Sequence, residues 1–302
     1  MNMTTSRNVT AFGVGNMGAA LAHALLKADT KVTIWNRTVD RPQVQSVLKA
    51  GATLEADVKA AISGSSDILL FCLIDYDAMY KTLEPIKGTS DGLAGKTIVN
   101  VTNGTPQQAL EMRDWIKARG AARYFDGAVL VTPQMVATPQ SLLVYSGESQ
   151  ETFDNIKTIL QPLGTPLYYG PQVDAAAAQD LAMLATMYGM FYGAFVGFGI
   201  LKRSGQGQDV KVAPGTKQIT IPVMAALTEY LGLLADVIDS EDWASNGGNP
   251  LLMQVAGVAN IIQAAKDANV NASGLEVLAE AMGKAVEDGW ADGNVAAAAK
   301  FI

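Results

Sequence analysis

The chain has one cysteine and one histidine among its 302 residues, which excludes several kinds of site. A disulfide needs two thiols, so Cys72 cannot form one within the chain, and its apolar surroundings at 68–74 predict a buried strand thiol. His23 falls inside the first expected helix, where a structural or surface role is favoured over a ligand role. No cluster of carboxylates replaces the missing ligands, so we expect no metal site.

Charged residues are also few, at 17% of the chain, and the net charge is −7. Binding to nucleic acid needs clustered lysine and arginine, and no such run occurs. The first eight residues are polar and lack the apolar core of a signal peptide, so we expect a reduced, cytoplasmic protein. Hydrophobic residues make up 49% of the sequence, which is ample for the cores of two domains.

One segment, 181–201, is long and apolar enough to pass the length test for a membrane span. Its glycines Gly189, Gly193 and Gly197 have the spacing at which helices approach closely. A helix buried on all sides between domains or subunits gives the same pattern. We expect the second arrangement and no membrane, because we identify only this one such segment and it lies between soluble-looking halves.

The first half of the chain alternates short β-rich runs with helical windows, which predicts a parallel sheet covered on both faces. The expected strands are 9–12, 32–35, 68–73, 97–101, 123–128 and 142–146. The expected helices run from the first glycine turn to about Ala28, over 57–62 and over 107–119.

From about Gly170 onward only helices are expected, separated by breakers at 204–207 and 245–248. We predict helices at 175–203, 217–238, 249–267, 274–288 and 294–301. The expected domains are a dinucleotide-binding (Rossmann) domain at 1–170, an interdomain helix at 171–203 and an all-α domain at 204–302. The long helix cannot bury both flanks in one small domain, so we predict an intertwined homodimer with exchanged C-terminal helices.

A G-x-G-x-x-G motif directly follows the first strand and opens the first helix. In this context Gly13 would make the tight turn, Gly15 would let the backbone approach a pyrophosphate, and Gly18 would let helix and strand pack closely. Phosphates would meet the helix N-terminus, beside Asn16 and Met17. The alternative is that the glycines only form a turn between strand and helix and bind no nucleotide.

The end of the second strand predicts which dinucleotide binds. An acidic residue there would suit the ribose hydroxyls of NAD, but the chain has Asn36, Arg37 and Thr38. A guanidinium and a hydroxyl suit a 2′-phosphate, and Arg41 lies one helical turn further on. We therefore expect NADP(H). The alternative is that Arg37 is only an exposed cation in a loop and binds no phosphate.

The apolar helix carries Asp180 near its start and Tyr188 eight residues later. A carboxylate beside so much apolar surface is costly unless something pairs with it. Eight residues are about 12 Å along a helix, so both side chains would share one side and flank a substrate. Together with the dinucleotide motif, this suggests a redox enzyme with proton-handling or cation-binding groups on the helix.

The order of domains resembles the β-hydroxyacid dehydrogenase superfamily, in which a lysine on the interdomain helix moves a proton. The stretch 125–129 resembles the substrate-binding segment of that superfamily, but 130–133 replaces the expected serine and glycines. Asp180 stands where the lysine is expected, so a hydroxyacid would face a like charge.

With these differences, the sequence resembles the NADPH-dependent imine reductases and reductive aminases. The resemblance covers nearly the whole chain. The motifs that carry the resemblance are 13–18, 35–38, 102–106, 143–148, the helix from Asp180 to Tyr188, and 253–257. The resemblance implies reduction of imines, formed from a ketone or aldehyde and an amine. It makes Asp180 the acidic catalytic residue and Tyr188 its partner, and it places Asn103 beside the nicotinamide. The pocket would be lined by Gln254, Met253, Leu227 and Met187.

A tryptophan frequent in the pocket of reductive aminases is missing, since the chain runs from Pro222 to Leu227 without one. Simpler explanations exist for the other residues. Asp180 could be a helix-start residue favoured by the helix dipole, Tyr188 could be core packing, Asn103 a turn residue, and Gln254 structural. We take Asp126 and Asp174 to be structural or solvated. A hydroxyacid dehydrogenase with an altered catalytic group and a nucleotide sensor without chemistry are the rival functions.

Overall fold

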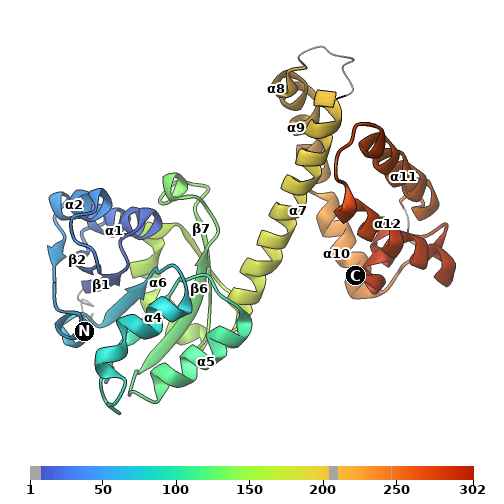
Figure 1. Cartoon of the computed structure of the whole chain (residues 1–302). Coiled ribbons are helices and arrows are strands. Elements are labelled where there is room, and N and C mark those ends of the chain that lie inside the picture. Colours follow the sequence, from blue (N-terminus) through green and yellow to red (C-terminus); the bar gives the residue numbers. More distant parts are fainter. Residues whose placement is uncertain (1–7, 204–209, 246) are drawn as a thin grey trace. The chain divides into compact units, whose positions relative to one another are not determined.

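The computed structural model describes residues 8–203, 210–245 and 247–302, arranged as two compact units. The first unit runs to Ala185 and the second runs from Thr186 to Ile302 (Figure 1). The polar N-terminal stretch before Asn8 and the expected helix breaker at 204–207 lie outside the described residues, as does Asn246 in the second breaker.

The first unit is built on one eight-stranded sheet with the order β3-β2-β1-β4-β5-β6-β7-β8. Strand order reverses between β1 and β4, which are parallel neighbours, and ligands of such sheets bind at the carboxyl ends of the strands near this point. The strands are β1 (Asn8–Phe12), β2 (Lys31–Trp35), β3 (Thr53–Leu54), β4 (Ile68–Phe71), β5 (Thr97–Asn100), β6 (Arg123–Val129), β7 (Leu142–Ser146) and β8 (Thr165–Tyr168).

The expectation of a parallel sheet is correct from β3 to β6 and wrong for β7, which pairs antiparallel to β6. The reason is the connection: residues 130–141 contain only the short turn η2 (Pro133–Met135) and no α-helix of the kind that usually carries a parallel crossover. The strands β3 and β8 were not predicted. Both are short, and the pattern of β8 alternates exposed and partly buried residues.

Helices cover both faces of this sheet, and alternate strand residues supply two separate cores. Leu70 faces the core beneath α1, α2 and α6, whereas Leu69 and Phe71 face the core beneath α3, α4 and α5. These helices are α1 (Asn16–Lys27), α2 (Pro42–Lys49), α3 (Val58–Ser63), α4 (Tyr76–Thr82), α5 (Pro106–Lys117) and α6 (Gln150–Leu160). The doubly wound layout follows from this alternation.

The second unit is helical, as expected. The 29-residue helix α7 has the predicted bounds, Ala175–Arg203, and crosses from the first unit into the second. It is followed by α8 (Val212–Gly215), η4 (Thr216–Thr220), α9 (Ile221–Leu227), α10 (Tyr230–Ser240), α11 (Leu251–Asp267), α12 (Ser273–Ala285), η5 (Val286–Trp290) and η6 (Val295–Phe301).

Within the residues that the structure describes, two helical segments, not one, are long and apolar enough to cross a membrane: Ala175–Arg203 and Val212–Ser240. The expectation of a single such segment is therefore wrong, because the polar residues of the second are too widely spaced to lower its mean hydropathy. Only 6% of the most apolar window in each segment is buried within the chain. The exposed apolar residues on them include Tyr188, Met190, Phe191, Phe195, Ile219, Ile221, Val223, Met224, Leu227, Leu231 and Leu233.

Candidate active site

The glycine motif forms a tight cradle between β1 and α1. Gly13 has a φ of +89°, and a Cβ atom there would lie 2.3 Å from the carbonyl oxygen of Cys72. A Cβ atom on Gly18 would lie 1.9 Å from the carbonyl oxygen of Gly13. Neither position tolerates a side chain. At Gly15, by contrast, no heavy atom lies within 4 Å of such a Cβ, so its backbone borders open space. A pyrophosphate fits this arrangement at the N-terminus of α1.

Asn36 braces this loop from the end of β2. Its Oδ1 accepts a hydrogen bond from the backbone N–H of Val14 at 2.8 Å, and its Nδ2 donates to the carbonyl of Thr38 at 2.7 Å. Both ends of the amide therefore hold backbone, which fixes the loop against the strand. Asn16 Oδ1 accepts from Gln43 Nε2 at 2.7 Å, which ties α1 to α2.

A cavity of about 590 Å³ lies over this cradle. All nine residues predicted to bind the dinucleotide line it: Gly13, Gly15, Asn16, Met17, Gly18, Asn36, Arg37, Thr38 and Arg41. It is also lined by residues that were not predicted to bind the dinucleotide: Trp35, Cys72, Leu73, Ile74, Ala78, Lys81 and Thr82. The expectation that Cys72 lies buried in a strand is wrong, since β4 ends at Phe71 and the thiol is half-buried at the cavity wall. Its burial nevertheless raises the pKa of the thiol to about 12.

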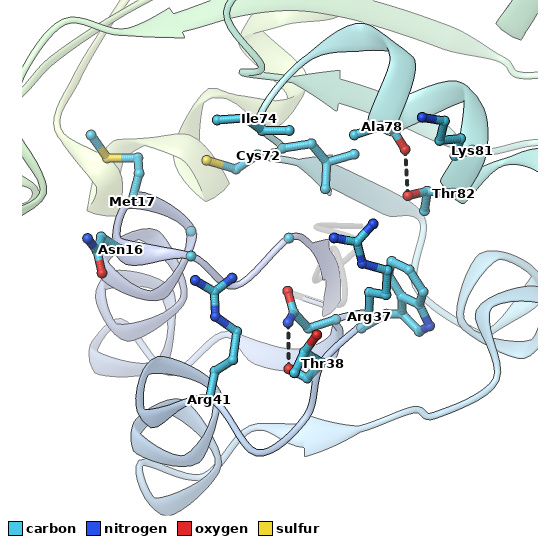
Figure 2. Close-up of a pocket in the computed structure, with 16 residues that line it drawn as sticks. Asn16, Met17, Arg37, Thr38, Arg41, Cys72, Ile74, Ala78, Lys81 and Thr82 are labelled. Atoms are coloured by element: carbon cyan, nitrogen blue, oxygen red, sulfur yellow. Dashed lines mark hydrogen bonds between the residues drawn. The ribbon is translucent and has the colours of Figure 1, made fainter.

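Three cationic side chains surround the cavity. Arg37 and Arg41 rise from the β2–α2 side, and Lys81 lies on the opposite side, on α4 (Figure 2). Because guanidinium groups bind phosphates in a bidentate manner, the arrangement suits a phosphorylated ribose. Lys81 was missed because α4 was not predicted. A signal existed in the N-cap Asp75, whose carboxylate accepts from the N–H of Ala78 at 2.7 Å.

Asp180 and Asn103, 77 positions apart in sequence, meet in the first unit. Asn103 Nδ2 donates to Asp180 Oδ2 at 2.7 Å. Asp180 is only 6% exposed. Burial raises the pKa of its carboxyl, and the hydrogen bond from Asn103 opposes that rise. Asn103 is thus more than a turn residue, because its side chain contacts the predicted catalytic carboxylate.

The loop that carries Asn103 is held at both ends. Before it, Thr102 Oγ1 accepts from the N–H of Leu73 at 3.1 Å. After it, Thr105 and Gln108 form a reciprocal capping box at the start of α5, with Pro106 in the first turn. The loop therefore presents Asn103 from a fixed backbone.

Asp180 is not a helix-start residue of the kind that a helix dipole favours. It is the sixth residue of α7, whose first turn contains no acidic residue. The start of α7 is anchored to the sheet by the buried Ser146, whose Oγ accepts from the N–H of Ala176 at 2.9 Å and donates to the carbonyl of Val173 at 2.8 Å.

The other predicted site residues belong to the second unit. Tyr188 is 62% exposed and is therefore not core packing within this chain, whereas Tyr192 has a structural bond, its hydroxyl accepting from the N–H of Gly274 at 2.8 Å. Gln254 Nε2 donates to the carbonyl of Asn249 at 3.0 Å at the start of α11. Met253 and Leu227 are exposed, and Met187 is half-buried.

A doubly wound sheet with a glycine cradle, facing cations and a buried carboxylate defines a dinucleotide-dependent oxidoreductase. Residues 8–170 match the NAD binding domain of 6-phosphogluconate dehydrogenase, and residues 173–302 match the NADPH-dependent reductive aminase-like C-terminal domain. An NADPH-dependent reductive aminase from Aspergillus oryzae is 35% identical over 98% of this chain and 97% of its own length.

Solved structures agree. A reductive aminase from Aspergillus terreus in complex with NADPH4, cyclohexanone and allyl amine is 34% identical, with a TM-score of 0.86 over 98% of this chain and 99% of that one. An imine reductase from the same organism, in complex with NADPH4 and dibenz[c,e]azepine, is 35% identical, with a TM-score of 0.84 over 99% of this chain and 100% of that one. The chain belongs to the NADPH-dependent reductive aminase family. It is an NADPH-dependent oxidoreductase that acts on C=N bonds.

Proposed function

We propose that the protein reduces imines and iminium ions to amines with NADPH, including imines formed from a ketone or aldehyde and an amine. The observation that carries this proposal is the buried Asp180, hydrogen-bonded to the exposed Asn103, in the same unit as the dinucleotide cavity. A hydroxyacid dehydrogenase would need a cation where this chain has a carboxylate, so that alternative has less support.

NADPH, when bound, supplies the hydride. The glycine cradle and the N-terminus of α1 would hold its pyrophosphate, and Arg37, Thr38 and Arg41 would hold the 2′-phosphate. The open space at Gly15, the two arginines on one side of the cavity and Lys81 on the other are the features that fit this cofactor.

Asp180 would act on the substrate nitrogen. A C=N bond accepts hydride readily only when its nitrogen is protonated, so the reacting substrate is a cation. A buried carboxylate stabilises such a cation strongly because few water molecules screen the attraction. Since burial raises the pKa of Asp180, the same group can also exchange a proton with the nitrogen.

Asn103 and Tyr188 would assist this carboxylate. The Asn103 amide fixes the orientation of Asp180 and has a carbonyl oxygen left to accept from the substrate N–H. Tyr188, on the same helix, would orient the substrate or relay a proton through its hydroxyl. We propose Gln254, Met253, Leu227 and Met187 as pocket residues, in a pocket widened by the missing tryptophan.

A turnover assay tests the proposal. The protein is mixed with NADPH and either a preformed cyclic imine or a ketone with a primary amine, and NADPH consumption is followed. We expect turnover with the cyclic imine and a preference for NADPH over NADH. Turnover of the ketone only when amine is present would identify reductive amination. Absence of turnover across a broad panel of imines would count against the function.

We further propose a soluble, cytoplasmic homodimer with exchanged C-terminal helices, divided into a dinucleotide domain at 1–170, a connecting helix at 171–203 and a helical domain at 204–302. The apolar surface of the two long helical segments supports this, because a second copy would cover it. Sedimentation analysis without detergent should give the mass of two chains. A monomer, or a protein that needs detergent, would contradict the assembly.

A further inference from the structure

A second buried carboxylate, which the proposed chemistry does not use, lies near the Asn103 loop. Asp126, in the middle of β6, is 1% exposed. Three donors converge on its Oδ1: the Tyr76 hydroxyl at 2.6 Å, the Tyr124 hydroxyl at 3.0 Å and the Asn100 amide at 3.2 Å. Such convergence offsets the cost of burying the carboxyl. Asp126 is therefore structural, as the sequence analysis allowed, but it is not solvated.

Two of these donors also contact the backbone of the Asn103 loop. Asn100 Oδ1 accepts from the N–H of Thr102 at 3.1 Å, immediately before Asn103. The Tyr76 ring packs against Gly104, immediately after it, where a Cβ atom would lie 2.2 Å from the ring. The hydrogen bonds of Asp126 thus hold the residues on both sides of Asn103.

Asp126 also lies beside the anchor of α7. Across the β6–β7 ladder its register partner is Ser146, whose hydroxyl bonds to the backbone of Val173 and Ala176. Asn103 lies on the loop after β5, and Asp180 lies near the start of α7. These two elements are therefore anchored at neighbouring positions of the β6–β7 ladder, by Asp126 and Ser146.

We propose that Asp126 is a positioning residue, which holds the Asn103 loop through Tyr76 and Asn100 and so keeps Asn103 against Asp180. The inference rests on the proposed function of that pair. It has an electrostatic side as well: burial raises the pKa of Asp126 to about 7, its three hydrogen bonds oppose the rise, and the like charge of Asp180 adds to it. The polar and titratable groups that face Asp126 are Tyr76 on α4, Asn100 on β5, Tyr124 on β6, Ser146 on β7 and Asp180 on α7.

Two substitutions separate the geometry from the charge. Tyr76→Phe keeps the ring against Gly104 and removes one hydrogen bond, so we expect kcat for a preformed imine to fall about tenfold, with the Kd for NADPH changed less than about twofold. Asp126→Asn keeps an oxygen acceptor and removes the carboxyl whose pKa is raised to about 7, so the change in kcat that ionisation of Asp126 causes near that pH should disappear. Tyr145→Phe is the matched control. Tyr145 is fully buried, and its hydroxyl has no hydrogen-bond partner in the described part of the chain.

Hydrogen–deuterium exchange of 101–105 gives a readout that does not depend on turnover. We expect faster exchange in Tyr76→Phe and wild-type exchange in Tyr145→Phe, with melting curves confirming that both are folded. Should Tyr76→Phe not fold, Asp126→Asn decides through its pH profile near pH 7. If Tyr76→Phe exchanges faster but the wild-type protein reduces no imine, the positioning role of Asp126 is retained and the proposed function is rejected. Wild-type exchange, kcat and pH profile in the folded variants would overturn the inference.

Discussion

Removing the Asn103 side chain should raise the pKa of Asp180. The amide donates to the Asp180 carboxylate at 2.7 Å; the carboxylate is 6% exposed, but Asn103 itself is exposed, so water can replace part of the lost bond. A hydrogen bond to a charged group contributes about 1.5–3 kcal/mol. Loss of this bond disfavours the ionised carboxylate, so Asn103→Ala should raise the pKa of Asp180 further above its ordinary value.

The assay uses an N-alkylated iminium salt, because the charge of this substrate does not titrate and only the enzyme changes with pH. Ionised Asp180 stabilises the cation, so the acidic limb of kcat/KM should move to higher pH in Asn103→Ala. The control is Asn155→Ala, which truncates an exposed asparagine on α6 of the same unit. An acidic limb that stays in place in Asn103→Ala would refute the assignment of that limb to the Asp180–Asn103 pair.

Three further predictions follow from the site and the buried carboxyls. Asp180→Asn should lower kcat about 10²–10⁴-fold in the NADPH assay and leave the Kd for NADPH, measured by fluorescence, nearly unchanged; a wild-type kcat would remove Asp180 from the mechanism. Arg37→Ala should raise the KM for NADPH about tenfold or more and the KM for NADH much less, because only NADPH has the 2′-phosphate; equal effects would contradict this role. Burial raises the folded-state pKa of Asp126 from 3.8 to about 7, so folding favours its protonated form. Its contribution to stability is then full below pH 3.8 and is lost as the pH rises to about 7, on the order of 4 kcal/mol. In thermal melts across that range, wild type should lose stability relative to Asp126→Asn, and parallel curves would contradict the raised pKa.

Much of the dinucleotide site could be predicted because it depends on local sequence. A strand, three glycines and a helix occupy adjacent positions, and the strand end that selects the cofactor is the next one in sequence. Lys81 was missed for the opposite reason. It reaches the cavity from α4, a short helix whose seven residues give too little periodicity to identify.

The hydrogen-bonded contacts of the buried carboxylates could not be predicted in the same way. Asp180 and Asn103 were each identified, but their direct hydrogen bond depends on how α7 starts against β7, and β7 runs opposite to the direction expected. Asp126 was set aside as structural or solvated because a single Asp in a strand gives no sign of its partners. Tyr76 and Asn100 come from separate elements, and only the folded sheet brings them together.

If Asp180 acts on the substrate nitrogen as proposed, its raised pKa gives the enzyme a basis for choosing its substrate. Without a cation nearby, burial makes the ionised carboxylate costly and favours its neutral form. A cationic C=N group beside the carboxylate lowers that cost. Part of the free energy of binding this substrate therefore offsets the ionisation of Asp180. A neutral carbonyl of the same shape offers no such compensation, and neither does an anionic hydroxyacid, which would add a like charge. The same burial that destabilises the empty site therefore favours protonated imines over the ketones from which they form.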